Sequence, residues 1–340
     1  MGTGRYDSQQ ITNTLYRILN GHEYRNVMNL ITAFLGLIRG LNLLFIALTQ
    51  VLFYYFILLP IFHDSDTDPY LHQKLFFLLI TASVFIAAAG YIINDYFDLN
   101  IDQVNKPHKL VVEKIIKRRW AIVWHLSLSA VGILLSFYVG WKVNNIFIGF
   151  ANLLCVALLW LYSTTFKRKL LIGNVIISLL SAWVILVLYF SEWARILQPD
   201  IAREELYAMT RVFRFAFLYA GFAFIISLIR EVLKDIEDMT GDAKYGCRTM
   251  PIVWGVHVAK LFISTWLVVL IASLGFIQFY VLQFRWWWSA LYCLVMIILP
   301  LLYVFRKLFL AKAPKDFHKL SSLIKLIMLT GILSMIFFRG

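Results

Sequence analysis

The chain has 340 residues, of which 61% are hydrophobic and only 15% are charged. Soluble domains are nearer half apolar and a quarter charged, so this composition excludes an ordinary soluble domain and indicates a membrane protein. The formal charge of +13 does not require a nucleic-acid partner, because basic residues on the cytoplasmic loops of a membrane protein explain it.

Apolar segments long enough to cross a bilayer recur along the chain, since a helix needs about twenty residues for the crossing. Nine are expected, at about 38–60, 73–93, 120–140, 145–162, 173–190, 212–230, 257–282, 287–305 and 320–338. Residues 1–36 are expected to be a cytoplasmic tail with an interfacial helix, and residues 37–340 a single all-α domain. The mixed-charge segment 191–210 is expected to lie outside the bilayer, partly as a surface helix.

The distribution of Lys and Arg predicts the orientation. Basic residues gather in the N-terminal tail and in alternate connecting loops, at 106–119, 167–169, 230–248 and 306–319. Because cytoplasmic loops carry the excess of Lys and Arg, we expect the N-terminus and these loops on the cytoplasmic side.

Two acidic motifs follow spans two and six, both on the predicted cytoplasmic side. Their aspartates are spaced i, i+3, i+7, and they are Asp95, Asp98 and Asp102 in the first motif and Asp235, Asp238 and Asp242 in the second. At about 100° per residue, each triplet falls within roughly a 60° arc of a helix and forms one acidic stripe. Solvated helix ends could explain one stripe, but two with the same spacing on the same side indicate a functional site.

Clustered carboxylates repel one another unless a cation holds them. Oxygen ligands suit Mg²⁺, which commonly binds through one or two carboxylates plus the phosphates of a substrate. Nearby Lys and Arg side chains would suit a diphosphate, while an interior rich in Phe, Tyr and Trp would suit a hydrocarbon chain. An isoprenyl diphosphate fits both halves of that description.

The motifs resemble those of the UbiA superfamily of intramembrane prenyltransferases. Asn94-Asp95-x-x-Asp98-x-x-x-Asp102 is similar to its first motif, and Asp235-x-x-Asp238-x-x-x-Asp242, continuing to Gly246-x-Arg248, is similar to its second. The resemblance implies a nine-helix bundle around a central cavity, with both motifs in cytoplasmic caps and two Mg²⁺ ions holding the diphosphate.

The resemblance also implies roles for further residues. The six aspartates would hold the metal ions and be essential to catalysis. The expected substrate-binding residues are Arg39, Asn42, Asn94, Lys106, Tyr162, Lys167 and Arg248. Among these, Lys106 and Lys167 could instead be ordinary cytoplasmic charges, Tyr162 an interface tyrosine and Arg248 a helix cap. Arg230 and Glu231 could simply pair locally.

The acceptor is less constrained by the sequence. Leu161-Tyr162-Ser163 with Lys167, together with the second motif, is most similar to family members that alkylate a prenylglyceryl phosphate. An aromatic quinone precursor is the second candidate acceptor. A divalent-cation transporter is a candidate of another class, but it would need acidic residues along a path through the bilayer, and the middles of the spans are nearly free of them. A non-catalytic scaffold that binds lipid diphosphates is a third.

Overall fold

The structure is a computed structural model that describes residue 32, residues 34–105 and residues 117–338. Across these residues the fold is all-α, as expected, and no strand is present. The N-terminal tail and most of the basic loop 106–119, including Lys106, lie outside the described residues.

The helices follow the predicted spans in order. Their bounds are α2 (Gly40–Phe53), α3 (Leu59–His63), α4 (Gln73–Asn105), α5 (Arg118–Lys142), α6 (Phe147–Thr164), α7 (Ile172–Phe190), α8 (Arg203–Lys244), α9 (Met250–Val253), α10 (Gly255–Leu282), α11 (Trp287–Cys293), α12 (Leu299–Leu310) and α13 (Pro314–Leu333). Within the described residues, nine helical segments are long and apolar enough to cross a membrane, which confirms the predicted number.

Two of these spans contain a π-helical turn for the same reason. The turn Tyr54–Leu58 joins α2 to α3, and the turn Leu294–Ile298 joins α11 to α12. In each span a proline follows two residues later, Pro60 or Pro300. Proline cannot donate a backbone hydrogen bond and clashes with the carbonyl four residues earlier, and the wider π turn relieves that conflict within a continuous span.

The structure corrects the expectation for residues 191–210. They contain a short 3-10 turn at Trp193–Arg195 and then the first turns of α8, rather than a separate surface helix. Helix α8 begins at Arg203, with Glu204 and Glu205 in its first turn, where acidic side chains favour the positive end of the helix dipole. Span six therefore starts about nine residues earlier than its apolar run indicated.

The expected basic loop at 306–319 is also mostly helical. Helix α12 continues to Leu310 and α13 begins at Pro314, so only 311–313 connect them. The acidic motifs likewise extend their spans, because α4 and α8 run without a break through Asp98 and Asp242. An apolar run marks the part of a helix inside hydrocarbon and therefore underestimates helices that emerge from it.

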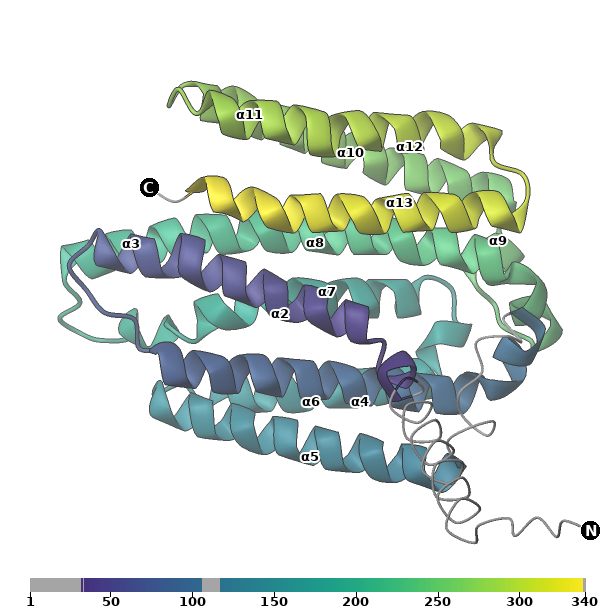
Figure 1. The fold of residues 1–340 in the computed structure, drawn as a ribbon, viewed down its shortest axis with the longest axis horizontal. Coiled ribbons are helices and arrows are strands. Elements are labelled where there is room, and N and C mark those ends of the chain that lie inside the picture. The colour runs from purple at the N-terminus through teal and green to yellow at the C-terminus, as the bar shows by residue number, and fades with distance from the viewer. Residues whose placement is uncertain (1–31, 33, 106–116, 339–340) are drawn as a thin grey trace, which may run out of the picture.

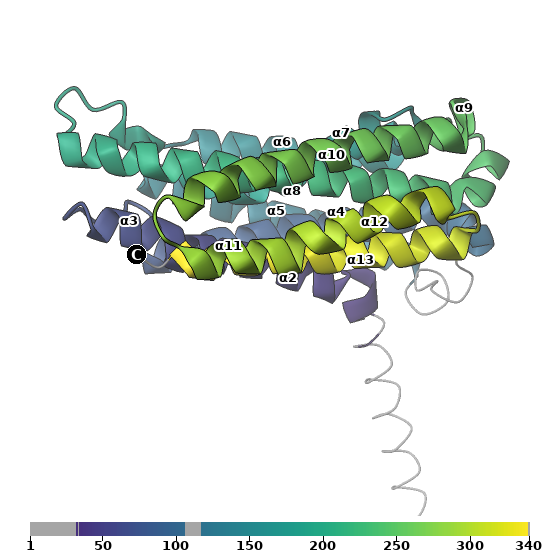
Figure 2. The ribbon, with the colours of Figure 1, turned by 90° about the horizontal axis from the view of Figure 1, so that it is seen from above.

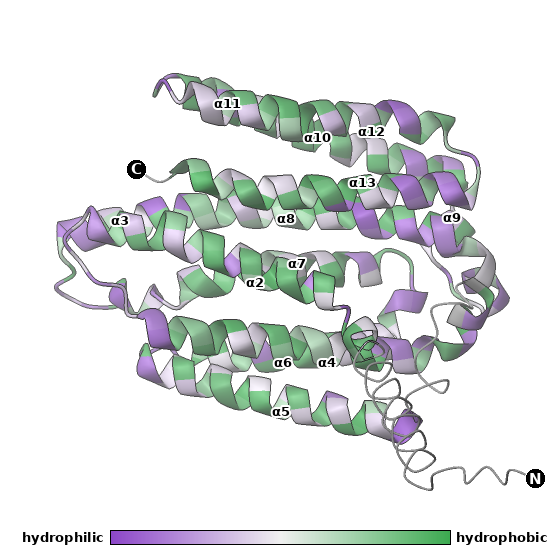
Figure 3. Ribbon diagram, viewed as in Figure 1, coloured by the Kyte–Doolittle hydropathy of each residue, from purple (hydrophilic) through white to green (hydrophobic). Residues whose placement is uncertain are grey.

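The long helices run along a common direction, with polar residues concentrated towards both ends of the bundle (Figures 1, 2 and 3). Helix α8 contributes to both main apolar cores. Its N-terminal half packs with α2, α4 and α7, and its C-terminal half packs with α10, α12 and α13. Helices α10 and α13 both pack against α8, and α12 packs against α10 and α13 (Figures 1 and 2). Helix α8 is therefore the element that joins the two halves of the bundle.

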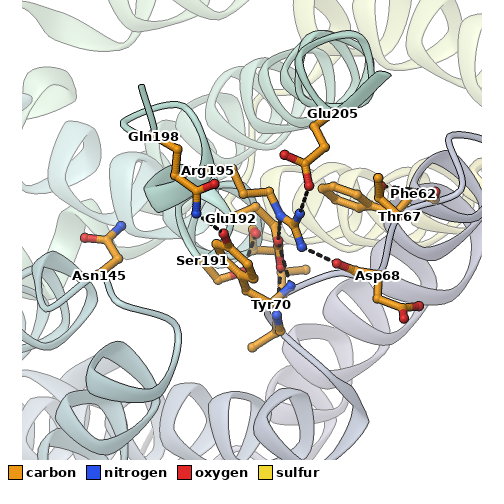
Figure 4. Close-up of polar contacts among 12 residues, drawn as sticks. Phe62, Thr67, Asp68, Tyr70, Asn145, Ser191, Glu192, Arg195, Gln198 and Glu205 are labelled. Carbon is orange, nitrogen blue, oxygen red and sulfur yellow. Dashed lines mark hydrogen bonds and ion pairs between the residues drawn. The ribbon is translucent and has the colours of Figure 1, made fainter. Parts of the chain in front are cut away.

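A buried ion pair fastens the end of the bundle where α7 leads into α8 (Figure 4). Glu192, with no exposed surface, accepts hydrogen bonds from Arg195 Nε at 2.8 Å and from the backbone amides of Tyr70 and Leu71 at 2.9 and 2.8 Å. Arg195 also donates to Glu205 on α8 at 2.8 Å, and its guanidinium lies 3.9 Å from the ring centroid of Tyr70. These contacts give both buried charges an oppositely charged partner. They also connect the segment that contains Tyr70 and the segment that contains Arg195 to the start of α8.

A cavity of about 490 Å³ opens at this same end, between α3 and the acidic loop that follows it. Its lining residues include Tyr55, His63, Asp64, Thr67 and Asp68. This cavity is at the opposite end of the bundle from the aspartate motifs and is not part of their site. The central cavity expected at the motifs stays a prediction.

Candidate active site

Both acidic motifs lie at one end of the bundle, the right-hand end in Figure 1, on the last turns of α4 and α8. The helical spacing places the described aspartates of each motif on one face, as predicted. The side chain of Asp102 lies outside the described residues.

Two cations pair with the first motif. Arg39 Nη2 lies 2.8 Å from Asp95 Oδ1, and the ammonium of Lys167 forms an ion pair with Asp98. Asn94 Nδ2 donates a 2.7 Å hydrogen bond to Asp98 Oδ2. These contacts bring together five of the residues that the sequence predicted, with Arg39 and Lys167 coming from positions distant from Asn94, Asp95 and Asp98.

Arg39 reaches the first motif because the chain bends sharply before α2. Its backbone is left-handed, with φ 52° and ψ 55°, a conformation that costs energy for a residue with a side chain and is often found at functional sites. The guanidinium also lies 5.0 Å from the ring centroid of Tyr91. The bend directs the side chain inwards, onto α4.

Lys167 is held by a tight 3-10 turn, Phe166–Arg168, that packs against the start of α7. Gly173 permits this approach, since a Cβ there would lie only 2.9 Å from Lys167 Cα. The backbone amide of Arg248 donates a 2.8 Å hydrogen bond to the Arg168 carbonyl. The turn that carries Lys167 is thus fixed to α7 and to the segment that follows the second motif.

The Lys167 side chain is only 10% exposed. Burial, together with the nearby charge of Arg168, lowers the pKa of its ammonium group to about 7. The carboxylates of Asp242 and Asp95 are close enough to favour the charged form. An anionic ligand bound at this turn would also favour the charged form of Lys167.

The second motif is joined to α7 by Asn174, whose Nδ2 donates a 2.8 Å hydrogen bond to Asp235 Oδ2. Asp238 and Asp242 are half-buried on the same helix. Tyr162, near the end of α6, lies close enough to Asp235, Asp242 and Arg39 to interact with their charges. Lys167, which pairs with Asp98 and lies near Asp242, connects the two motifs.

Two predicted substrate-binding residues have other surroundings. The Arg248 side chain is exposed, and the contact that ties this residue to the site is made by its backbone amide. Asn42 Oδ1 accepts a 2.6 Å hydrogen bond from Lys325 on α13, rather than contacting an aspartate.

The candidate set drawn from the sequence did not include Lys325 or Asn174. The sequence contained a signal for each: Lys325 is an isolated charge within an apolar run, and Asn174 follows the glycine that opens span five.

The donor set suits Mg²⁺ by its chemistry, since carboxylate oxygens at one end of two helices are the ligands that this ion prefers. Across the described side chains, however, no three or more His, Cys, Asp or Glu residues converge closely enough to hold an ion. Asp95 and Asp98 pair with cations instead, and Asp235 pairs with an amide. The predicted two-ion site remains a prediction.

Comparisons with known proteins identify the family of the chain. The sequence model of the UbiA prenyltransferase family matches residues 52–327. A digeranylgeranylglyceryl phosphate synthase of Methanosphaera stadtmanae is 29% identical over 261 residues, covering 76% of this chain and 85% of the relative. Another, of Methanothermobacter thermautotrophicus, is 32% identical over 222 residues, covering 65% and 69%.

Solved structures share the fold. One of a digeranylgeranylglyceryl phosphate synthase in membranes has a TM-score of 0.57 at 22% identity and covers 91% of this chain and 99% of that one. A UbiA homolog from Archaeoglobus fulgidus, bound to DMAPP and Mg²⁺, has a TM-score of 0.54 at 15% identity and covers 89% and 98%.

The fold and the family match together define a multi-pass integral membrane enzyme that transfers prenyl groups. The chain belongs to the UbiA prenyltransferase family.

Proposed function

We propose that this prenyltransferase moves an isoprenyl group from a prenyl diphosphate to a prenylglyceryl phosphate, with Mg²⁺ as its cofactor, at the site between the two acidic motifs. The observation that carries the proposal is the position of Lys167. Its ammonium pairs with Asp98 of the first motif and lies near Asp242 of the second. A diphosphate bound with metal ions between the two motifs would bring negative charge to this position, and the ammonium of Lys167 could compensate that charge directly.

The proposed metal ligands are the motif aspartates Asp95, Asp98, Asp102, Asp235, Asp238 and Asp242. When bound, Mg²⁺ would neutralise the charge that develops on the departing diphosphate. Asn94 and Asn174, which donate hydrogen bonds to Asp98 and Asp235, would keep these carboxylates in place. Orientation of metal ligands by such neighbours commonly matters to both affinity and activity.

The cations of the site would assist the bond cleavage. As the carbon–oxygen bond of the donor breaks, the electron pair leaves with the diphosphate, and Arg39 and Lys167 are positioned to compensate the added negative charge. Lys106 and Arg248 are proposed to approach the diphosphate from the loops that follow the two motifs. Tyr162, which lies near Asp235, Asp242 and Arg39, is proposed to contact the reacting end of the donor.

The acceptor supplies the nucleophile. Its hydroxyl oxygen would bond to the allylic carbon and lose its proton, which gives an ether. The names of the related synthases support a glyceryl phosphate acceptor, and the similarity of Tyr162, Lys167 and the second motif to such enzymes favours it. An aromatic acceptor would use the same donor chemistry and is the competing outcome. We also propose that the N-terminus and both motifs face the cytoplasm.

A transfer assay with purified protein tests the proposal directly. Radiolabelled geranylgeranyl diphosphate and Mg²⁺ would be supplied with geranylgeranylglyceryl phosphate and 4-hydroxybenzoate as competing acceptors. We expect a labelled diether phosphate that disappears with EDTA and returns when Mg²⁺ is restored in excess.

Two other outcomes would change the proposal. Labelled aromatic product with no diether phosphate would replace the acceptor and leave the donor site in place. Full activity in EDTA, with the trace metal content verified, would contradict the role of Mg²⁺.

A further inference from the structure

A second group of charged side chains lies deeper in the bundle than the aspartate motifs. Glu231 on α8 accepts contacts from two cations of the same helix, Arg230 Nη1 at 2.8 Å and Lys234 Nζ at 3.2 Å. Lys325 Nζ, from α13, donates to Asn42 Oδ1 at 2.6 Å. The group therefore collects side chains from α2, α8 and α13, and α13 packs against both of the other two helices.

These side chains are close enough to interact electrostatically. The guanidinium groups of Arg230 and Arg39 both lie near Lys325 and repel its ammonium. Lys325 also lies 5.2 Å from the ring centroid of Phe45 on α2. It is the twelfth residue of α13, about 16 Å along the helix from its first residue at 1.5 Å per residue.

Positive charge exceeds negative charge in this group. Arg39, Arg230, Lys234 and Lys325 supply four cationic groups, while Glu231, Asp95 and the neighbouring Asp235 supply three acidic ones. Arg39 is already paired with Asp95, and both neighbours of Lys325 on α2 are uncharged, the amide oxygen of Asn42 and the ring of Phe45. Arg230 Nε is buried and has no hydrogen-bond partner within the described part of the chain.

Unbalanced cations within a span are costly and usually mark a functional site. An anionic group of a ligand would remove that cost and would give Arg230 Nε an acceptor. The guanidinium fork of arginine suits phosphate oxygens, and a lysine adds a point charge. Side-chain exposures of 19% for Arg230 and 28% for Lys234 leave these groups accessible to a small ligand.

The donor diphosphate fits this position less well than the acceptor does. Glu231 is the one carboxylate that Arg230 and Lys234 contact, so the cluster lacks the set of acids that Mg²⁺ would need. Arg230 precedes Asp235 by five residues and Asp238 by eight, which places it about 7 to 12 Å deeper along α8. A ligand anchored here could extend a hydroxyl towards the motifs without occupying them.

We propose that Arg230, Lys234 and Lys325 bind the anionic headgroup of the acceptor, a monophosphate ester, one to two helical turns below the aspartate motifs. This inference rests on the proposed function, since it assigns the acceptor half of the same reaction. It makes these three residues determinants of acceptor specificity, while the aspartate motifs serve the donor.

The test compares four variants at saturating geranylgeranyl diphosphate and Mg²⁺. Lys325→Met and Arg230→Gln remove one charge each from the cluster, and Lys319→Met removes an exposed charge from the same helix as Lys325. KM and kcat are measured with geranylgeranylglyceryl phosphate, with geranylgeranylglycerol, which lacks the phosphate, and with 4-hydroxybenzoate. Lys325→Arg is included because it preserves the charge.

Lys325→Met and Arg230→Gln should raise the KM for the phosphorylated acceptor about 10- to 100-fold, as expected for lost hydrogen bonds to a charged group. The KM for the donor should change less than about twofold. Transfer to geranylgeranylglycerol, which we expect to be slow already in the wild type, should not fall further, and Lys325→Arg should recover most of the affinity. Lys319→Met should behave as the wild type.

Other outcomes would separate the two proposals. Diether phosphate formed with an unchanged acceptor KM in both charge-removing variants would overturn the cluster assignment and leave the proposed function intact. An equal loss with all acceptors, not recovered by Lys325→Arg, would indicate a structural role and overturn it as well. If the wild type transferred only to 4-hydroxybenzoate, both the proposed acceptor and its phosphate site would be wrong.

Discussion

The amide of Asn174 donates a 2.8 Å hydrogen bond to Asp235, and this contact joins the first turn of α7 to the second acidic motif on α8. The residue before it, Gly173, permits the turn that carries Lys167 to pack against the same helix end. Two adjacent residues therefore position one functional group from each side of the site.

Gly173→Ala should weaken donor binding. A Cβ at this position would lie 2.9 Å from Lys167 Cα and 3.0 Å from the Phe166 carbonyl oxygen. Both contacts are with backbone atoms, so the turn must move, and Lys167 moves with it. We expect the KM for geranylgeranyl diphosphate to rise about tenfold or more, because charge-assisted contacts depend on geometry. Titration of the donor in the transfer assay measures this change.

Gly221→Ala is the matched control, because a Cβ there meets nothing within 4 Å. Its KM should equal that of the wild type. Equal KM values for both alanine variants would show that the close packing of Gly173 is not needed to position Lys167.

Asp95→Asn should abolish transfer while the protein still folds. The substitution keeps the shape of the side chain but removes one proposed metal ligand and the charge that pairs with Arg39. A loss of about 3 kcal/mol of transition-state stabilisation would lower kcat about 100-fold. We expect the same direction of change for Asp238→Asn. Turnover with excess Mg²⁺ and the thermal unfolding midpoint in detergent are the two measurements.

An aspartate at the opposite end provides the comparison for Asp95. Asp64 lies 3.2 Å from Arg211 in an exposed ion pair, and such pairs contribute little to stability. Asp64→Asn should leave both turnover and unfolding nearly unchanged. Normal turnover in Asp95→Asn would refute the metal-ligand assignment of that residue.

Glu192→Gln should destabilise the fold without a direct effect on the donor site. The substitution replaces the buried carboxylate beside Arg195 Nε with a neutral amide and leaves Glu205 as the remaining acidic partner, and breaking a buried ion pair costs about 3–5 kcal/mol. For a chain of this size we expect the unfolding midpoint in detergent to fall by roughly 5–10 °C. The KM for donor should remain unchanged at temperatures where the variant is folded.

Glu204→Gln tests whether this effect depends on burial. Glu204 is exposed in the first turn of α8, one residue before Glu205. Its midpoint should shift by less than about 2 °C, because favourable charge at a helix end contributes less than about 1 kcal/mol. Similar shifts in both variants would show that the Glu192–Arg195 pair adds no special stability.

The proposed orientation can be tested by cysteine labelling in intact cells. Asp200→Cys introduces an exposed thiol in the segment between α7 and α8, and Lys244→Cys introduces one at the end of α8. The native Cys155, Cys247 and Cys293 are buried, which should keep background labelling low. A membrane-impermeant maleimide should label Asp200→Cys directly and Lys244→Cys only after permeabilisation. The reverse pattern would invert the proposed topology.

The sequence predicted the spans well because their signal is local. A helix that crosses hydrocarbon must be apolar over its whole length, and a one-dimensional count finds it. The ends of α8 and α13 were harder to place. Their first turns carry Glu204 or Lys315 and resemble loops in composition, although the structure shows that they are helical.

The candidate site was predictable in its acids and less so in its cations. The regular spacing of Asp95 and Asp98 marks a helical face, and the pairing of Lys167 with Asp98 agrees with the predicted grouping. No spacing rule links Lys325 to Asn42, which lie 283 positions apart in the chain. A contact of that kind forms only because α2 and α13 pack together, and the sequence does not reveal which helices are neighbours.

Helix α8 has 42 residues and is about 63 Å long, roughly twice the thickness of the hydrocarbon core. It is anchored at both ends, through Glu205 to Arg195 and through Asp235 to Asn174. Inserting or deleting one residue between these anchors would rotate one of them by about 100° relative to the other. Many side chains along this stretch could therefore vary during evolution, but their number should stay fixed, and single-codon insertions or deletions there should be far less tolerated than substitutions.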